Sequence, residues 1–369
     1  MNRSKLTEIE IRGFKSIAYN RPLKLDFRDI NVLLGANGAG KSNLFGFFKM
    51  LSFMMSGSLQ SFVAQNGFNN SLLHYGPKNT PLLDGRLNFQ NNDSSDIYRF
   101  SLTHAQESLI FNSEEIEWIK SDASSQRFKP ELNFKESALT THNHETCRIV
   151  RNMISGCKTY QFHDTSATGT LRLASTVDSA PYLQSEGNNL ASFLYYLKQN
   201  FNDAYRRIVS YVQMVIPQFQ DFYLEPTPKG YILLKWIDRS ANDYILTPSQ
   251  FSDGSLRYIA LATLLLQPEK TMPRVIFIDE PELGLHPYAI NQLIEMIKDA
   301  ALHAQIIIAT QSPALADGFD VEDVAVIEWL DHELCTQARR LQASDLNKWL
   351  EDYTLSELWD KNIIGGRPV

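Results

Sequence analysis

The chain is poor in cysteine and has no long apolar run. Three cysteines occur among 369 residues, Cys147, Cys157 and Cys335, which argues against a disulfide framework and favours a reducing compartment. No apolar stretch approaches the roughly 20 residues that span a bilayer. The opening segment, MNRSKLTEIEIRGFKSI, also has no apolar signal-peptide core. We therefore expect a cytoplasmic protein with no membrane association.

An excess of positive charge is missing as well. The formal net charge is −7 and the isoelectric point is about 5.7, which argues against a basic coat for non-specific nucleic-acid binding. One stripe of basic residues, interrupted by Asp26 and Asp29, consists of Arg12, Lys15, Arg21, Lys24 and Arg28. We interpret this stripe as a solvated hairpin face, and direct nucleic-acid binding stays an open alternative.

What the sequence does contain is an alternation of strands and helices. An apolar strand is expected over residues 30–34, with a helix over 43–54 after it, and the last third of the chain alternates in the same way. This order predicts a parallel sheet flanked by helices. The elements expected in the last third are helices over 256–267 and 288–302 and strands over 275–278, 306–309 and 324–328.

The segments before and between these elements have other patterns. Short alternating segments over residues 85–118 predict an antiparallel meander. The further expectations are strands over 6–11, 23–27 and 160–163, a loop over 121–147, two helices over 188–216 that break near Asn200, and a hairpin over 223–237. We expect three parts: an N-terminal lobe over 1–120, an inserted lid subdomain over 121–245, and a C-terminal lobe over 246–369.

The clearest motif is a glycine-rich turn between the strand over 30–34 and the next helix. It reads Gly35-Ala36-Asn37-Gly38-Ala39-Gly40-Lys41-Ser42, a full GxxxxGK[ST], with Asn43 next in the chain. The glycines let backbone N–H groups converge on phosphate oxygens, and the helix N-terminus adds partial positive charge. The motif predicts an ATP site in which Lys41 reaches the β- and γ-phosphates and Ser42 ligates Mg²⁺. The residues from Asn37 to Asn43 are the expected nucleotide contacts.

A second motif is the apolar strand over 275–278, which ends in two carboxylates, Asp279 and Glu280. A buried strand of this kind delivers acidic side chains to the sheet edge where ligands of α/β folds bind. We expect Asp279 to hold Mg²⁺ and Glu280 to orient and deprotonate the attacking water. A strand that ends in Asp-Glu is common, but its place after a P-loop favours this interpretation.

A third motif, Phe251-Ser252-Asp253-Gly254-Ser255, stands at the start of the helix expected over 256–267. A Ser hydroxyl and free N–H groups at a helix start form an anion site, although the motif taken alone is better interpreted as a plain helix cap, because Ser is a preferred N-cap residue. The order P-loop, Ser-Gly motif, acidic strand separates these alternatives. It is the order of P-loop, signature and acidic pair in ABC-type ATPase heads.

Two further segments follow in that same order. Glu282-Leu283-Gly284-Leu285-His286-Pro287 occupies the place of the loop that crosses the dimer seam of ABC heads. Ala309-Thr310-Gln311-Ser312-Pro313 follows the next strand, where a switch residue senses the γ-phosphate. Gln311 is the expected switch residue. Because Gln carries no positive charge, the step would depend less on pH than one with His.

On these residues the chain resembles the RecF and structural-maintenance-of-chromosomes branch of ABC ATPases. It is similar to the predicted prokaryotic ATPases of the AAA_21 and AAA_15 type, which are related to OLD-family heads. The segments that carry the resemblance are IRGFKSI, YQFHDTS, GNNLASFLYYL, ATQSP and TLSELWDKNIIGGRP. The resemblance implies an α/β P-loop NTPase with a parallel-sheet core, an antiparallel β meander and an inserted helical and β lid. It also implies a head-to-tail homodimer, either ATP-dependent or constitutive, in which Ser252 and Gly254 contact the γ-phosphate held by the other subunit.

The sequence departs from this pattern at two positions. Asp253 replaces the first Gly of the usual signature, and Gln311 stands where transporters carry His; both departures concern the hydrolysis rate and not nucleotide binding. ABC heads use a Gln to complete the Mg²⁺ shell, and the sequence does not decide whether Gln90 or Gln161 has this role. A possible zinc set, His142, His144, Cys147 and Cys157, lacks paired Cys-x₂₋₄-Cys spacing, so we interpret these residues as loop histidines and buried thiols.

The resemblance predicts an ATP-hydrolysing switch or motor subunit. We expect it to regulate a separately encoded effector or nuclease, as in anti-phage defence systems. The alternatives are a RecF-like DNA-repair ATPase that binds DNA itself and a nucleotide-sensing scaffold of low activity. A transporter subunit is disfavoured because the interval between P-loop and signature is long and irregular.

Overall fold

The computed structural model describes residues 4–121, 124–179 and 181–367. The chain forms two compact units. Unit 1 contains Met1–Thr159 and Gln311–Val369, and unit 2 contains Tyr160–Thr310. The stretch expected as a lid, 121–245, contributes to both units.

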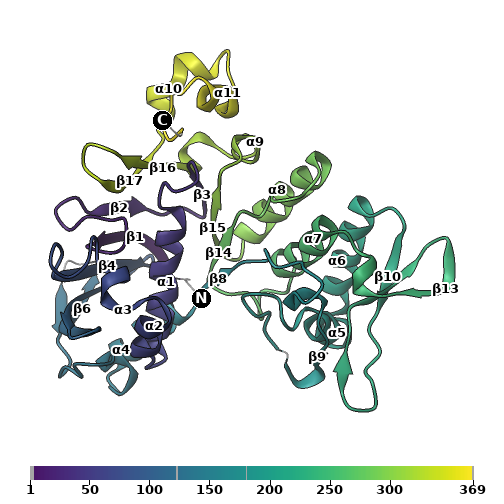
Figure 1. Ribbon diagram of the computed structural model, residues 1–369, viewed down its shortest axis with the longest axis horizontal. Coiled ribbons are helices and arrows are strands. Elements are labelled where there is room, and N and C mark those ends of the chain that lie inside the picture. The colour runs from purple at the N-terminus through teal and green to yellow at the C-terminus, as the bar shows by residue number, and fades with distance from the viewer. Residues whose placement is uncertain (1–3, 122–123, 180, 368–369) are drawn as a thin grey trace. The chain divides into compact units, whose positions relative to one another are not determined.

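Unit 1 contains a six-stranded antiparallel sheet in the order β2-β1-β4-β5-β6-β7 (Figure 1). Its strands are β1 (Lys5–Arg12), β2 (Leu23–Asp26), β4 (Leu82–Gln90), β5 (Ser94–Ala105), β6 (Ser108–Lys120) and β7 (Ser125–Phe128). Alternate residues are buried, so one face covers the core. The meander expected over 85–118 is β4 to β6. A β-bulge at Asn112, where Ser101 pairs with Ser113 but Leu102 pairs with Phe111, joins two expected short segments into one strand.

Helices cover the core face of this sheet. Figure 1 shows α1 (Lys41–Met55) beside the strands, and its Phe47 stacks on Phe100 at a ring distance of 6.0 Å. The shorter helices around it are α2 (Leu59–Gln65), α3 (Phe68–Leu72) and α4 (Glu145–Ser155), with a 3₁₀ turn over Ala138–Thr140. The apolar residues of α1 thus form the centre of unit 1.

The expected loop over 121–147 is wrong in part, because it contains β7 and the start of α4. β7 reads SQRF and has no apolar alternation, so the sequence carries no strand signal there. Its pairing is supported across the strands, where Arg127 lies 3.0 Å from Glu117 of β6.

A second group of strands in unit 1 carries the glycine-rich turn. β3 (Ile30–Leu34) pairs in parallel with β16 (Val324–Leu330), and β16 pairs antiparallel with β17 (Cys335–Arg340). Because β3 and β16 are parallel, their carboxyl ends lie at the same edge. The remaining elements are α9 (Pro313–Ala316), a 3₁₀ turn over Val321–Asp323, α10 (Ala343–Leu350) and α11 (Leu355–Asp360).

Unit 2 is built on a parallel pair, β14 (Val275–Asp279) and β15 (Gln305–Thr310), whose residues are all buried. This confirms the parallel pairing expected for these apolar strands. The helices of unit 2 are α5 (Leu190–Asn200), α6 (Asn202–Val215), α7 (Asp253–Leu265) and α8 (Pro287–Ala301). The break between α5 and α6 falls at Phe201, next to the expected Asn200.

The rest of unit 2 corrects two expectations. Only Tyr160 of the strand expected over 160–163 is in a strand, β8 (Cys157–Tyr160). The hairpin expected over 223–237 is instead divided between two sheets, because β11 pairs with β9. The strands are β9 (Ser175–Thr176), β10 (Phe219–Tyr223), β11 (Tyr231–Ile232), β12 (Lys235–Asp238) and β13 (Ala241–Leu246), and 3₁₀ turns cover Thr170–Arg172, Val177–Ser179 and Pro248–Gln250. Within the described ranges, every helix is too short or too polar to cross a bilayer.

Candidate functional site

The glycine-rich turn links the carboxyl end of β3 to the N-terminus of α1. Gly40 has a left-handed φ of 106°, and a Cβ at this position would lie 2.2 Å from Thr336 Oγ1, so only glycine fits. No side chain of the described residues caps the N-terminus of α1. The N-terminus of this 15-residue helix thus presents its partial positive charge without a side-chain cap, an arrangement that suits a phosphate.

Lys41 lies folded over this turn. Its ammonium donates to the carbonyl of Gly35 at 2.6 Å and to that of Ala36 at 2.9 Å, and the side chain is buried. A lysine held in this way places a positive charge within the turn, where it can compensate phosphate charge.

A hydroxyl cluster that the sequence does not reveal supports the turn from outside. Thr336 Oγ1 lies 2.9 Å from the carbonyl of Ala39 and 2.7 Å from Ser16 Oγ. The amide of Asn43 donates to the same Ser16 hydroxyl at 2.6 Å. Ser16 belongs to the IRGFKSI segment, but Thr336 lies in a polar strand about 300 residues further along, with no motif to identify it.

The acidic pair lies at the end of β14 in unit 2. Asp279 is buried, with 8% of its surface exposed, and accepts a hydrogen bond from Gln161 Nε2 at 3.1 Å. A ring nitrogen of His163 lies 3.0 Å from the Asp279 carbonyl. Glu280 adopts a left-handed φ of 43° and donates its N–H to Ala309 at 2.8 Å. For a non-glycine residue this φ costs about 1–3 kcal/mol, a strain that is typical of functional sites.

The two glutamines considered for the Mg²⁺ shell have different neighbours in the structure. Gln90 ends β4, opposite Lys5 of β1 and Ser95 of β5 in the antiparallel sheet of unit 1. Gln161 is the glutamine that lies against the expected Mg²⁺ ligand Asp279.

Ser252 caps the N-terminus of α7, because its hydroxyl accepts the N–H of Ser255 at 3.1 Å. Its neighbour Asp253, which replaces the usual glycine, forms an ion pair of 2.9 Å with Arg172. A Cβ at Gly254 would lie 2.3 Å from the carbonyl of Gly284, so this glycine permits close packing of the signature on the segment 282–287. Both segments belong to unit 2.

Arg257 of α7 connects its helix to two loops and is not marked by any motif. Its Nε donates to the carbonyl of Phe162 at 3.1 Å, and its Nη2 to that of His163 at 2.9 Å. Its Nη1 donates to the carbonyl of Leu283 at 3.1 Å. The signature helix, the segment that carries Gln161 and the loop over 282–287 are thus held by one side chain.

The expected switch segment is divided at the boundary between the units. Thr310 ends β15 in unit 2 and donates a hydrogen bond to Glu282. Gln311 is the next residue, belongs to unit 1 and is exposed.

The residues weighed as zinc ligands have other surroundings. His144 stacks on Phe128 at 4.4 Å, His142 packs edge-on to the same ring, and Cys147 and Cys157 are buried. In the part of the chain that the structure describes, no three His, Cys, Asp or Glu side chains are grouped as metal ligands.

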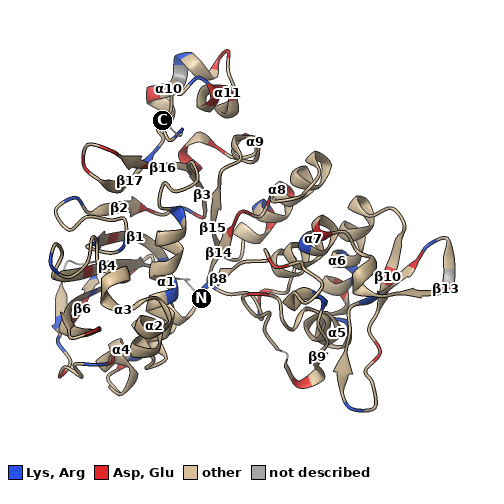
Figure 2. Cartoon of the chain, viewed as in Figure 1, with Lys and Arg blue, Asp and Glu red and all other residues tan. Residues whose placement is uncertain are grey.

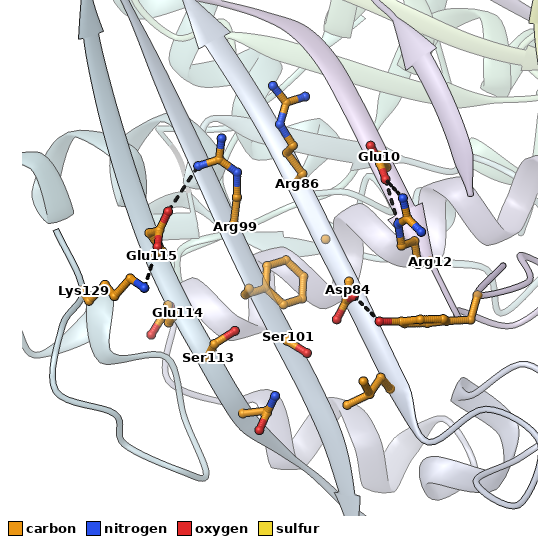
Figure 3. A pocket seen from close by; sticks show the side chains of 15 residues that line it. Glu10, Arg12, Asp84, Arg86, Arg99, Ser101, Ser113, Glu114, Glu115 and Lys129 are labelled. Atoms are coloured by element: carbon orange, nitrogen blue, oxygen red, sulfur yellow. Dashed lines mark hydrogen bonds and ion pairs between the residues drawn. The ribbon is translucent and has the colours of Figure 1, made fainter. Parts of the chain in front are cut away.

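The outer face of the antiparallel sheet is hollowed, with a volume of about 520 Å³ (Figure 3). Its charges compensate one another: Arg12 lies 2.6 Å from Glu10, and Lys129 lies 3.1 Å from Glu115. Although burial acts to raise it, hydrogen bonds from Arg12 and Lys24 hold the pKa of Glu10 below its usual value. Figure 2 shows acidic and basic residues interspersed in this part of the molecule.

The basic stripe of the N-terminal segment is paired in the same way. Arg12 and Lys24 pair with Glu10, Arg21 with Glu333 at 2.7 Å and Arg28 with Asp323 at 3.0 Å. This pairing agrees with our interpretation of the basic stripe as a solvated hairpin face.

Known proteins are similar to this chain in sequence and fold. A family model described as "AAA domain" (AAA_23) matches residues 8–199, and one described as "AAA domain, putative AbiEii toxin, Type IV TA system" (AAA_21) matches residues 177–317. The energy-coupling factor transporter ATP-binding protein EcfA2 of Lactobacillus delbrueckii subsp. bulgaricus is 30% identical over 129 residues, 34% of this chain. The match spans 42% of the length of that relative.

Two solved structures share the fold. An SmcHead bound to the C-winged helix domain of ScpA has a TM-score of 0.56 at 16% identity, covering 92% of this chain and 99% of that one. An Smc head domain with an extended coiled coil, bound to the C-terminal domain of ScpA derived from Pyrococcus furiosus, has a TM-score of 0.54 at 13% identity, covering 95% and 99%.

The fold and the glycine-rich turn define a P-loop ATPase of the ABC and SMC-head class. Within that class the chain belongs to the AAA-domain family whose model covers residues 8–199, more than half of its length.

Proposed function

We propose that this protein binds and hydrolyses ATP as a head-to-tail homodimer. The P-loop amides and Lys41 bind the β- and γ-phosphates, and Glu280 orients the attacking water and accepts its proton. Ser252 and Gly254 reach the γ-phosphate bound by the second copy, and Gln311 senses it. The observation that carries the proposal is the uncapped N-terminus of α1, with the buried ammonium of Lys41 held inside the turn.

The residues fit a Mg²⁺ ion. The Ser42 hydroxyl, the Asp279 carboxylate and the side-chain carbonyl of Gln161 are hard oxygen ligands of the type that Mg²⁺ prefers. The hydrogen bond from Gln161 Nε2 to Asp279 fixes which end of the amide points to the carboxylate. Bound Mg²⁺ would supply positive charge to the phosphate oxygens.

The cellular role in this proposal is that of a switch subunit in the cytoplasm. Closure of the homodimer by ATP would be read by a separately encoded effector or nuclease, as in anti-phage defence. Direct binding of DNA is less favoured, because four of the five cations of the basic stripe are held in ion pairs.

Lys41→Ala tests the proposal. Loss of the ammonium removes the charge that neutralises the phosphates, so the variant should bind ATP at least about 100-fold more weakly, a change of roughly 3 kcal/mol. Isothermal titration of wild type and variant with ATP and Mg²⁺ measures this, with Lys49→Ala on the same helix as the matched control. Equal affinities in all three proteins would remove the P-loop assignment.

A further inference from the structure

The Ser-Gly motif contains a carboxylate that its proposed role does not need. Asp253 lies in the first turn of α7, directly after Ser252, which caps the helix. A carboxylate at this position stabilises the helix, because it faces the positive end of the helix dipole. The same charge opposes a phosphate, which would use that positive end as well. For the motif to receive a γ-phosphate, the charge of Asp253 has to be compensated.

The compensating cation is Arg172. It ends the 3₁₀ turn over Thr170–Arg172, and its Nη2 donates to Oδ1 of Asp253 at 2.9 Å. The two residues are 81 positions apart in the chain, and both belong to unit 2. The side chain of Asp253 is 63% exposed, whereas that of Arg172 is only 10% exposed. The pair therefore has no net charge, and the cation is the partner with the more fixed surroundings.

Three backbone carbonyls hold the guanidinium of Arg172 in place. Its Nε donates to the carbonyl of Thr165 at 2.8 Å, and its Nη2 also donates to that of Phe251 at 3.2 Å. Its Nη1 donates to the carbonyl of Pro248. Phe251 is the first residue of the Ser-Gly motif, so Arg172 is anchored to the chain that leads into the motif. Because the guanidinium is held in this way, the ion pair also fixes where the carboxylate of Asp253 lies.

The ion pair lies in the wall of a cavity of about 520 Å³. Among the described residues that line this cavity, Arg172 is the single cation, so no neighbour there can take over its charge. Solvent screens the exposed carboxylate of Asp253, and the contribution of such a pair to folding stability is small. Its effect on an anion at the same helix start is larger, because an uncompensated carboxylate repels a phosphate directly.

We propose that Arg172 is a positioning residue of the ATPase cycle, which neutralises Asp253 so that the Ser-Gly motif can receive the γ-phosphate held by the second copy. The inference rests on the proposed function and adds to it the residue that compensates the departure from the usual signature. Without Arg172 the carboxylate opposes the phosphate, so closure of the homodimer and hydrolysis weaken together. Binding of ATP by the P-loop of unit 1 does not depend on the pair.

The test is a double-mutant cycle on kcat for ATP hydrolysis. Arg172→Gln removes the cation, so kcat should fall about 10-fold, while the affinity for ATP in isothermal titration stays within about twofold. Asp253→Asn removes the carboxylate at constant size. In that background Arg172→Gln should change kcat by less than about twofold, because no charge is left to compensate.

A further variant separates charge from structure. Arg172→Lys keeps the positive charge, but its three donors cannot replace the four hydrogen bonds of the guanidinium. It should recover most of the kcat that Arg172→Gln loses. The matched control is Arg206→Gln, which removes an ion pair of 3.5 Å with Asp221 in the same unit and should keep the wild-type kcat.

Three results would overturn this role of Arg172. An equal loss of kcat from Arg172→Gln in the wild-type and Asp253→Asn backgrounds would mean that the side chain only supports the loops through their carbonyls. An equal loss in Arg172→Lys and Arg172→Gln would mean the same, and an unchanged kcat in Arg172→Gln would mean that the carboxylate does not act on the site. Failure of the proposed function has a different signature, because the wild-type protein itself would then not hydrolyse ATP.

Discussion

Asp96 is a single residue whose burial makes the stability of unit 1 depend on pH. It lies on β5 with 4% of its surface exposed, and burial raises its pKa to about 6. The folded state therefore holds this proton more tightly than the unfolded chain, whose carboxyl has a pKa near 3.8. The stabilisation is complete below about pH 4 and is lost as the pH rises through about 6.

Asp96→Asn should remove this dependence. The amide keeps the size of the side chain without its charge, so above pH 7 the variant should be more stable by about 1–3 kcal/mol, with little difference near pH 4. Thermal unfolding at pH 4.5 and 7.5 measures the effect, and Asp93→Asn at the exposed turn before β5 is the control. A variant no more stable than wild type at pH 7.5 contradicts the assigned cost of the buried charge.

At the same scale, the sequence identifies residues that belong to one short motif. Lys41, Asp279 and Glu280 could be proposed as site residues in this way, because each belongs to a motif that follows an apolar strand. Gln161 could not be chosen over Gln90, since the choice depends on which side chain meets Asp279, 118 residues away. Thr336 carries no signal for the same reason.

Among the elements, strands with an apolar pattern were predictable and polar ones were not. β3, β14 and β15 have nearly every residue buried, which leaves a continuous apolar run in the sequence. β7 and β17 read SQRF and CTQARR, and they are held by pairing with their neighbours and not by an apolar face of their own. Such strands are stabilised by contacts with residues far away in the chain, so the sequence of the strand itself does not predict them.

Arg257 links elements and gives a prediction at this scale. Arg257→Met keeps the length of the side chain but leaves the carbonyls of Phe162, His163 and Leu283 without their donor. Because these loops carry or adjoin the proposed catalytic groups, we expect kcat to fall about 10-fold while ATP affinity stays within about twofold. Steady-state ATPase assays and ATP titration separate the two quantities.

A matched control distinguishes positioning from general destabilisation. Arg207→Met removes an ion pair of 2.9 Å with Asp299 that joins α6 and α8 and includes none of the three carbonyls bound by Arg257. It should lose similar or less stability and keep wild-type kcat. If both variants lose the same fraction of kcat, Arg257 has no specific role in positioning the loops.

For the whole molecule, the sequence determined the class and the structure added the division into two units. The P-loop lies in unit 1, and the Ser-Gly motif over 251–255 and the acidic pair lie in unit 2. The order of motifs was sufficient for the ABC and SMC-head class. The proposed effector would be encoded outside this chain, so no residue pattern here could identify it.

The central claim is that ATP closes a homodimer and that hydrolysis through Glu280 reopens it. Glu280→Gln should retain ATP but hydrolyse it at least about 100-fold more slowly, because the water loses its base. The ATP-bound dimer should then persist. Ser252→Arg should block closure, while each copy still binds ATP through its own P-loop.

The most direct test is the mass of Glu280→Gln by light scattering, with and without ATP and Mg²⁺. One chain has a mass of 42.1 kDa, so the account predicts a shift to about 84 kDa, twice that value, on addition of ATP. The double variant with Ser252→Arg should bind ATP and stay at the mass of one chain. A mass that does not respond to nucleotide in either protein contradicts the account.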